Sequence, residues 1–162
     1  MENVSMLTRP GIGQKYAYLA AALLVATLAP QLARATLGEP ETTIAADAAE
    51  LKASVKSTEQ TNYRVHEIQL PSGTVLREFA TVGGIVFAVA WSGPAMPNLQ
   101  QTLGSYFDVY VTAAKAPHAG HRHLQVQQDN FVMQSSGRMR AFTGRAYLPQ
   151  AVPAGVSLDE LH

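Results

Sequence analysis

The chain contains no cysteine, few charged residues and no surplus of either charge. The absence of cysteine excludes disulfides, thiolate metal sites, cysteine nucleophiles and lipid attachment through an N-terminal cysteine. Charged residues make up 15% of the 162 positions, with 12 Lys+Arg against 12 Asp+Glu. A general nucleic-acid binder needs a basic surplus, so nucleic acid is not an expected partner. With 47% hydrophobic residues, the composition is that of a folded chain rather than a disordered one.

The N-terminal residues 1–35 have the features of a secretory signal peptide. Arg9 and Lys15 precede an uncharged apolar run, residues 17–29, and Pro30 ends that run. The run of 13 residues is shorter than the roughly 20 that a membrane-spanning helix needs. A basic region followed by a short apolar core is typical of an export signal, and an uncleaved N-terminal anchor is the alternative.

A cleavage site follows the apolar run, because Ala33 and Ala35 place small residues at the −3 and −1 positions. There is no twin-arginine pair, which favours the general secretory route. We therefore predict cleavage after Ala35 and export to the periplasm of a Gram-negative bacterium or to the extracellular space. The mature chain, residues 36–162, is then one domain without a stable membrane anchor.

Hydrophobic periodicity in the mature chain predicts the element order α-βββ-α-ββ. Apolar residues recur at helical spacing in two segments and alternate with polar residues in others. The third strand is apolar on both faces, which predicts a central strand covered on both sides. The prediction is a single α+β domain with an antiparallel sheet of about five strands and two helices packed on it. The expected helices span residues 42–57 and 98–116, and the expected strands span residues 63–70, 74–82, 85–91, 124–135 and 139–148.

Three histidines within six residues, His118, His121 and His123, form a weak candidate metal site. Neutral imidazole is the commonest protein ligand of zinc, copper and nickel. The segment reads as a loop flanked by glycine and proline, with no strand or helix to fix the geometry of the ligands. A solvated polar loop is therefore the preferred interpretation, and no cofactor is expected.

Three arginines, Arg138, Arg140 and Arg145, lie close together near the end of the chain. They are candidates for binding an anionic ligand such as a phosphate or an acidic glycan. The alternative, which we favour, is that they pair across the sheet with Glu67 and Glu78. A β-bulge at the intervening Gly144 would let Arg145 join either face.

A carboxylate pair is a second candidate for chemistry. A hairpin centred on residues 72–73 would place Glu67 directly opposite Glu78, with His66 beside them. Paired carboxylates carry out glycoside hydrolysis, so a small envelope hydrolase or isomerase is an alternative function. Trp91, at the end of the third expected strand, is either an anchor at the edge of the core or part of a ligand groove.

The expected mature chain contains the segments HEIQLPSG at 66–73, VLREF at 75–79, GIVFAVAW at 84–91, LGSYF at 103–107, SGRMRAFTGRAYLP at 136–149 and PAGV at 153–156. Together these segments resemble a family of bacterial exported proteins, domain of unknown function 2844. The resemblance covers nearly all of the expected mature chain. It implies a Gram-negative exported protein, implies no activity and transfers no catalytic residue, and it does not extend to the histidine cluster.

The leading functional hypothesis is a non-enzymatic periplasmic domain that binds a protein or an anionic envelope ligand. Its basis is the small size, the expected export and the lack of a convincing catalytic set. The alternatives are the hydrolase or isomerase described above and weak periplasmic metal binding through the histidine loop. A buried pocket that holds a carboxylate of raised pKa would favour the enzyme, whereas an open face of the sheet would favour binding.

Overall fold

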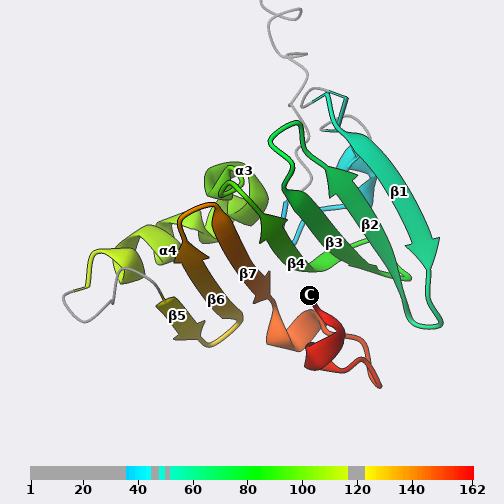
Figure 1. Cartoon of the computed structure of the whole chain (residues 1–162). Coiled ribbons are helices and arrows are strands. Elements are labelled where there is room, and N and C mark those ends of the chain that lie inside the picture. Colours follow the sequence, from blue (N-terminus) through cyan, green and yellow to red (C-terminus); the bar gives the residue numbers. More distant parts are fainter. Residues whose placement is uncertain (1–35, 45–47, 50–51, 117–122) are drawn as a thin grey trace, which may run out of the picture. The chain divides into compact units, whose positions relative to one another are not determined.

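The computed structural model describes residues 36–44, 48, 49, 52–116 and 123–162 (Figure 1). These residues form a seven-stranded antiparallel sheet with the order β1-β2-β3-β4-β7-β6-β5. One meander runs from β1 to β4 and a second from β5 to β7, and they join where β4 pairs with β7. The strands are β1 (Ser54–Glu59), β2 (Tyr63–Gln69), β3 (Val75–Thr81), β4 (Val86–Gly93), β5 (His123–Gln128), β6 (Phe131–Arg138) and β7 (Ala141–Tyr147).

The expected five-stranded sheet with two helices is wrong. The first error is the extent of the helix expected over residues 42–57, in which Ile44, Ala48 and Ala49 are helical but the later described residues are not. A 3₁₀ turn, Glu41–Thr43, begins this segment, and the chain is extended as β1 from Ser54. Lys52 has a φ of 52°, a left-handed conformation that no α-helix continues through. All six residues of β1 pair with β2. Because pairing along a whole strand outweighs a weak helical preference, tertiary structure decides this segment.

The second error is the number of strands near the C-terminus. The single strand expected over residues 124–135 is a hairpin, in which Asp129 and Asn130 form the turn between β5 and β6. Asp and Asn favour turns because their side chains hydrogen-bond to nearby main chain. β6 then continues to Arg138, so the next turn lies at Met139 and Arg140, where Arg140 has a φ of 59°.

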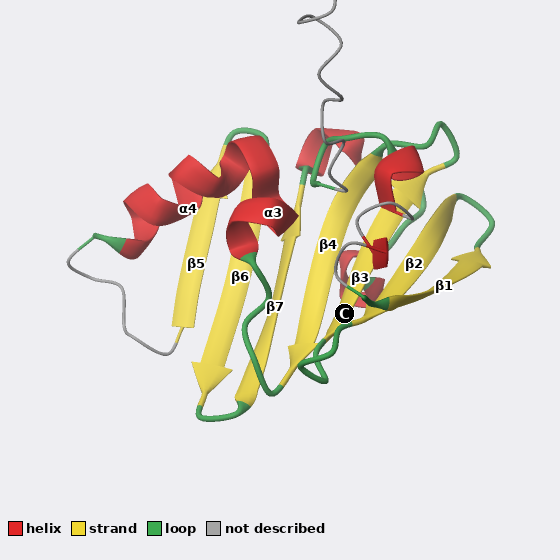
Figure 2. Ribbon diagram, turned by 90° about the horizontal axis from the view of Figure 1, so that it is seen from above, coloured by secondary structure: helices red, strands yellow, loops and turns green. Residues whose placement is uncertain are grey.

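The central meander and the later helix are confirmed. The three strands expected between residues 63 and 91 are β2, β3 and β4. The helical segment begins at Asn98, whose side chain accepts a hydrogen bond from the Gln101 N–H. It comprises α3 (Leu99–Leu103), a 3₁₀ turn (Gly104–Tyr106) and α4 (Phe107–Ala114), and Figure 2 shows it lying over β5, β6 and β7. No helix among the described residues is long and apolar enough to cross a membrane.

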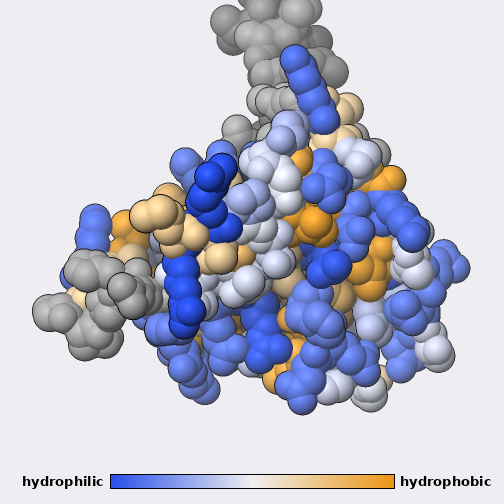
Figure 3. Space-filling view, in the orientation of Figure 1, coloured by the Kyte–Doolittle hydropathy of each residue, from blue (hydrophilic) through white to orange (hydrophobic). Residues whose placement is uncertain are grey.

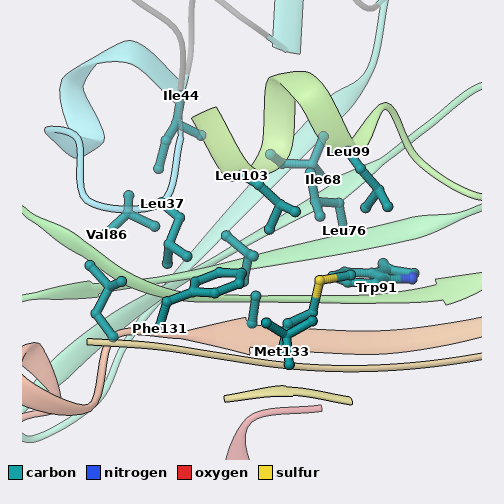
Figure 4. Close-up of a cluster of buried hydrophobic side chains, with 14 of the residues drawn as sticks. Leu37, Ile44, Ile68, Leu76, Val86, Trp91, Leu99, Leu103, Phe131 and Met133 are labelled. Atoms are coloured by element: carbon teal, nitrogen blue, oxygen red, sulfur yellow. The ribbon is translucent and has the colours of Figure 1, made fainter. Parts of the chain in front are cut away.

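The core lies on both faces of the sheet. On the helix-covered face, Trp91, Met133 and Phe131 pack beneath Leu99 and Leu103 of α3 (Figure 4). On the opposite face a second cluster packs against the C-terminal segment, residues 149–162. As the sequence predicts, β4 is covered on both sides, since all six residues from 86 to 91 are buried. The second cluster comprises Phe79, Phe87, Ala88, Ala90, Val132, Tyr147 and Leu161.

Candidate functional site

The C-terminal segment covers only part of its face, and the uncovered part forms a pocket of about 570 Å³. Leu161 and His162 bound the pocket on one side, and strands of both meanders form its floor. In Figure 3, hydrophilic side chains predominate over the face seen in the orientation of Figure 1. We call this site the polar pocket; side chains of this face that line it are Arg77, Ser92, His123, Gln125, Gln134, Ser136, Thr143 and Arg145.

The strand register arranges these side chains in two rows across the sheet. One row runs from Arg77 through Ala90 and Arg145 to Gln134, because these residues pair on adjacent strands. The next row runs through the hydroxyl side chains Ser92, Thr143 and Ser136 and ends at His123. Side chains two residues apart on a strand share a face, so both rows line the same pocket.

Two arginines stand on either side of a small residue in the first row. Arg77 and Arg145 both pair with positions on β4, and the residue between them is Ala90. Strands are about 4.8 Å apart, so the two arginine Cα atoms are about 10 Å apart. Ala90 is 2% exposed and packs with Leu161 in the second cluster, so the C-terminal segment covers the interval between the two arginines. Both arginines line the polar pocket beside this segment.

Each guanidinium is held in place by hydrogen bonds. Arg77 donates from Nε to Glu67 Oε2 at 2.9 Å and from Nη1 to the main-chain oxygen of His162 at 2.9 Å. Arg145 donates from Nε to Gln134 Oε1 at 3.0 Å and from Nη1 to the carbonyl of Leu158 at 2.6 Å. These bonds fix the orientation of both side chains before any ligand arrives, which lowers the entropic cost of binding.

The charges of the two arginines are balanced differently. Glu67 forms an ion pair with Arg77. Arg145 has no carboxylate within ion-pair distance among the residues that the structure describes. Arg145 therefore brings an uncompensated positive charge to the polar pocket.

The arginines that the sequence grouped together occupy different places. Arg145 lines the polar pocket, Arg138 lies exposed at the end of β6, and Arg140 is exposed in the turn that follows. None of the ion pairs in the described part of the chain joins them to Glu67 or Glu78, so the favoured cross-sheet pairing is wrong. The reason is topological, because β4 separates β2 and β3, which carry the two glutamates, from β7 and β6, which carry Arg145 and Arg138.

Gly144 makes room for the side chain of Trp91 and does not form a β-bulge. The β4–β7 register is continuous through Gly144, and the irregularity in the sheet lies between Phe79 and Ala80 instead. A Cβ at Gly144 would lie 2.3 Å from Cζ2 of Trp91. The indole thus lies across the glycine on the helix-covered face, where Trp91 is 3% exposed. Trp91 belongs to the core cluster of that face and is also among the residues that line the polar pocket.

The carboxylates proposed for catalysis lie on opposite faces. The β2–β3 register pairs His66 with Glu78 and Glu67 with Arg77. This is one residue away from the expected register, and a shift of one residue moves a side chain to the other face. Glu67 therefore lies beside the polar pocket, whereas Glu78 is 1% exposed on the helix-covered face.

His66 belongs to a separate polar cluster that contains Ser57 and Glu41. Ser57 Oγ lies 2.8 Å from Nδ1 of His66, and Glu41 Oε2 lies 3.1 Å from Nε2. Arg64 forms an ion pair with the same carboxylate. Burial of the ring lowers the pKa of His66, and the positive charge of Arg64 lowers it further. A neutral ring can donate to Glu41 from Nε2 and accept from Ser57 at Nδ1.

This cluster holds the N-terminal segment to the sheet. Serine hydrolases use the same residue types, but there the serine contacts Nε2 and the acid contacts Nδ1, the reverse of this arrangement. The lowered pKa of His66 also makes it a weaker base. Next to the cluster, the N–H of Glu41 donates to the carbonyl of Gly84 at 2.8 Å. We interpret the cluster as the attachment of residues 36–44 to β2 and to the turn before β4.

The histidine loop is described only at its end. His123 is exposed and lines the polar pocket, while His118 and His121 lie outside the described residues. No group of three or more metal-ligating side chains occurs within the residues that are described.

Neither Arg77 nor the row of hydroxyl side chains was predicted as part of a site. A signal was available in the alternation of polar residues along β6 and β7, where Gln134 and Ser136 share a face, as do Thr143 and Arg145. This alternation can be interpreted only when the positions of the turns are known, because a register shift of one residue moves every side chain of a strand to the other face of the sheet.

The comparisons with known proteins identify a family without an assigned activity. A family model described as "Protein of unknown function (DUF2844)" matches residues 33–161. No curated protein and no solved structure matches the chain. The matched residues include every described strand and the whole of the polar pocket except His162. The chain thus belongs to the DUF2844 family of proteins of unknown function.

Proposed function

We propose that the protein is a binding domain that holds a small anionic ligand in the polar pocket. The observation that carries the proposal is that Arg77 and Arg145 line the same pocket, each with its guanidinium held by hydrogen bonds. A volume of about 570 Å³ lies within the usual range for small-molecule sites, roughly 300–1,000 Å³. Since Arg145 has no carboxylate partner among the described residues, an anion would complete its charge balance.

The proposal is tested by titrating the purified protein with sodium acetate and following the arginine Nε–H signals by NMR. We expect a saturable shift of the Arg145 and Arg77 signals. The Arg145→Ala variant should bind acetate at least about tenfold more weakly, because a hydrogen bond to a charged group contributes about 1.5–3 kcal/mol. Arg145→Lys keeps the charge but loses the planar fork, and we expect an intermediate affinity.

Arg138→Ala is the matched control, since it removes the same charge from the exposed end of β6 and leaves the polar pocket intact. This variant should bind acetate as the unmodified protein does. An equal loss of acetate affinity in Arg138→Ala and Arg145→Ala would mean that long-range electrostatics causes the loss, and it would contradict a binding site at the polar pocket. The absence of any saturable shift would contradict the proposal altogether.

We also propose that the protein is exported and that it acts outside the cytoplasm. The support is the basic region, short apolar run and Ala33–Ala35 site of the N-terminal sequence. Intact-mass measurement of the protein recovered from a Gram-negative host should give a chain that begins at or near Thr36. Recovery of the protein with Met1 retained would contradict cleavage.

A further inference from the structure

We infer that the ligand of the polar pocket is an acidic saccharide, bound through its carboxylate at Arg145 and through its hydroxyl groups at the neighbouring row of side chains. This inference rests on the proposed function and adds the chemical class of the ligand. Its basis is the composition of the arginine row and the hydroxyl row that line the pocket. Together they provide one positive charge without an ion-pair partner among the described residues, that of Arg145, and several uncharged polar side chains.

The charge of the pocket favours a ligand with a single negative charge. Arg77 is already neutralised by Glu67, whose Oε2 lies 2.9 Å from the arginine Nε. Arg145 is the arginine of the pocket that lacks such a partner in the described part of the chain. A carboxylate matches one guanidinium in charge and accepts a charge-assisted hydrogen bond from it. A polyanion would need more basic side chains than these.

The uncharged side chains of the pocket favour a ligand with several hydroxyl groups. Ser92, Thr143 and Ser136 form a row beside Arg145, and Gln134 and Gln125 continue the arginine row toward the sheet edge. Hydroxyl and carboxamide groups both donate and accept hydrogen bonds, as sugar hydroxyls do. A simple anion would use the arginine and leave these groups to water.

The fixed geometry of the arginines agrees with this assignment. Gln134 Oε1 accepts from Nε of Arg145, so this carboxamide is oriented with its amino group available to a neighbouring hydroxyl. The carbonyl of Leu158 holds Nη1 of the same guanidinium. The remaining edge of the guanidinium, at Nη2, is the donor left for a carboxylate oxygen.

The test compares the binding of D-glucuronate, acetate and D-glucose to the purified protein by NMR titration. We expect glucuronate to bind at least about tenfold more tightly than acetate, which corresponds to one or two additional net hydrogen bonds. Glucose, without the carboxylate, should bind at least about tenfold more weakly than glucuronate. Arg145→Ala should lose the preference for glucuronate over glucose.

Two variants separate the hydroxyl contacts from the charge. Thr143→Val and Ser136→Ala each remove one hydroxyl group from an exposed or half-buried position that contributes nothing to the core clusters. Each should weaken glucuronate binding by about threefold or more and leave acetate binding unchanged. Weaker binding of both ligands, or of neither, would contradict the role of the hydroxyl row.

The outcomes distinguish the two proposals. Equal binding of glucuronate and acetate overturns the saccharide and leaves the anion site standing. Equal binding of glucuronate and glucose overturns the acidic saccharide, and if acetate also gives no saturable shift it overturns the proposed function with it. Binding of none of the three probes contradicts both proposals.

Discussion

Replacement of Phe87 by alanine should lower the free energy of unfolding by about 3–5 kcal/mol, the largest effect that we expect from a single substitution. Phe87 is 0% exposed and lies at the centre of the second-face core. Its ring centroid is 6.2 Å from that of Tyr63, edge-on, and 6.3 Å from that of Phe79. Alanine would remove both ring contacts and leave a cavity at the join between the two meanders. Urea denaturation followed by circular dichroism measures the loss.

Val82→Ala is the control for this prediction. Val82 lies in the turn after β3 and is 68% exposed, so its truncation should change stability by no more than about 0.5 kcal/mol. A loss below about 1 kcal/mol in Phe87→Ala would show that the second cluster adds little to the fold. The C-terminal segment packs on this cluster through Leu161. A small loss would therefore mean that this segment does not form a stable side of the polar pocket.

Replacement of Glu41 by alanine should cost about 2–4 kcal/mol. The carboxylate is the shared partner of Arg64 and His66, and its side chain is 16% exposed. Removal of one member of a buried ion pair costs about 3–5 kcal/mol, and partial exposure of Arg64 at 29% reduces that figure. The variant should also expose the segment 36–44 to faster amide hydrogen exchange, since Glu41 attaches this segment to the sheet.

Glu59→Ala is a matched control, because it removes a second carboxylate from the same arginine. Glu59 lies 4.0 Å from Nε of Arg64 and its side chain is 84% exposed. Exposed pairs contribute about 0–1 kcal/mol, so this variant should remain close to the unmodified protein in urea denaturation. Equal effects of the two substitutions would contradict the role of Glu41 as the attachment point.

Local patterns in the sequence predicted the elements whose neighbours are close along the chain. The β2–β3–β4 meander follows from strand alternation and short turns, and the helix from Asn98 follows from its cap and its apolar spacing. The same rules failed for residues 54–59, where six consecutive pairs with β2 stabilise an extended chain. The same rules also missed the turn at Asp129 and Asn130. A two-residue turn between two similar strands hardly interrupts the alternation of apolar and polar residues.

The candidate site was predicted in part. Arg145 was identified as a ligand candidate, and it does line the polar pocket, but it was grouped with Arg138 and Arg140 by proximity in sequence. Its actual neighbours across the sheet are Ala90 and Gln134, which come from other strands. Register and strand order decide such neighbours, and both depend on pairings between distant parts of the chain.

By itself, the sequence determined the kind of residues available and the family to which the chain belongs. It established a chain without cysteine chemistry or net charge, a central strand apolar on both faces and the arginines near the C-terminus. The tertiary structure alone decided that β7 pairs with β4, which brings Arg145 to within two strands of Arg77 and leaves Ala90 between them. The physical reason is that backbone groups make the hydrogen bonds between strands, whereas the burial of whole apolar faces of the sheet selects which strands become neighbours. The pocket therefore depends on the spatial order of the strands in the sheet and not on any contiguous sequence motif.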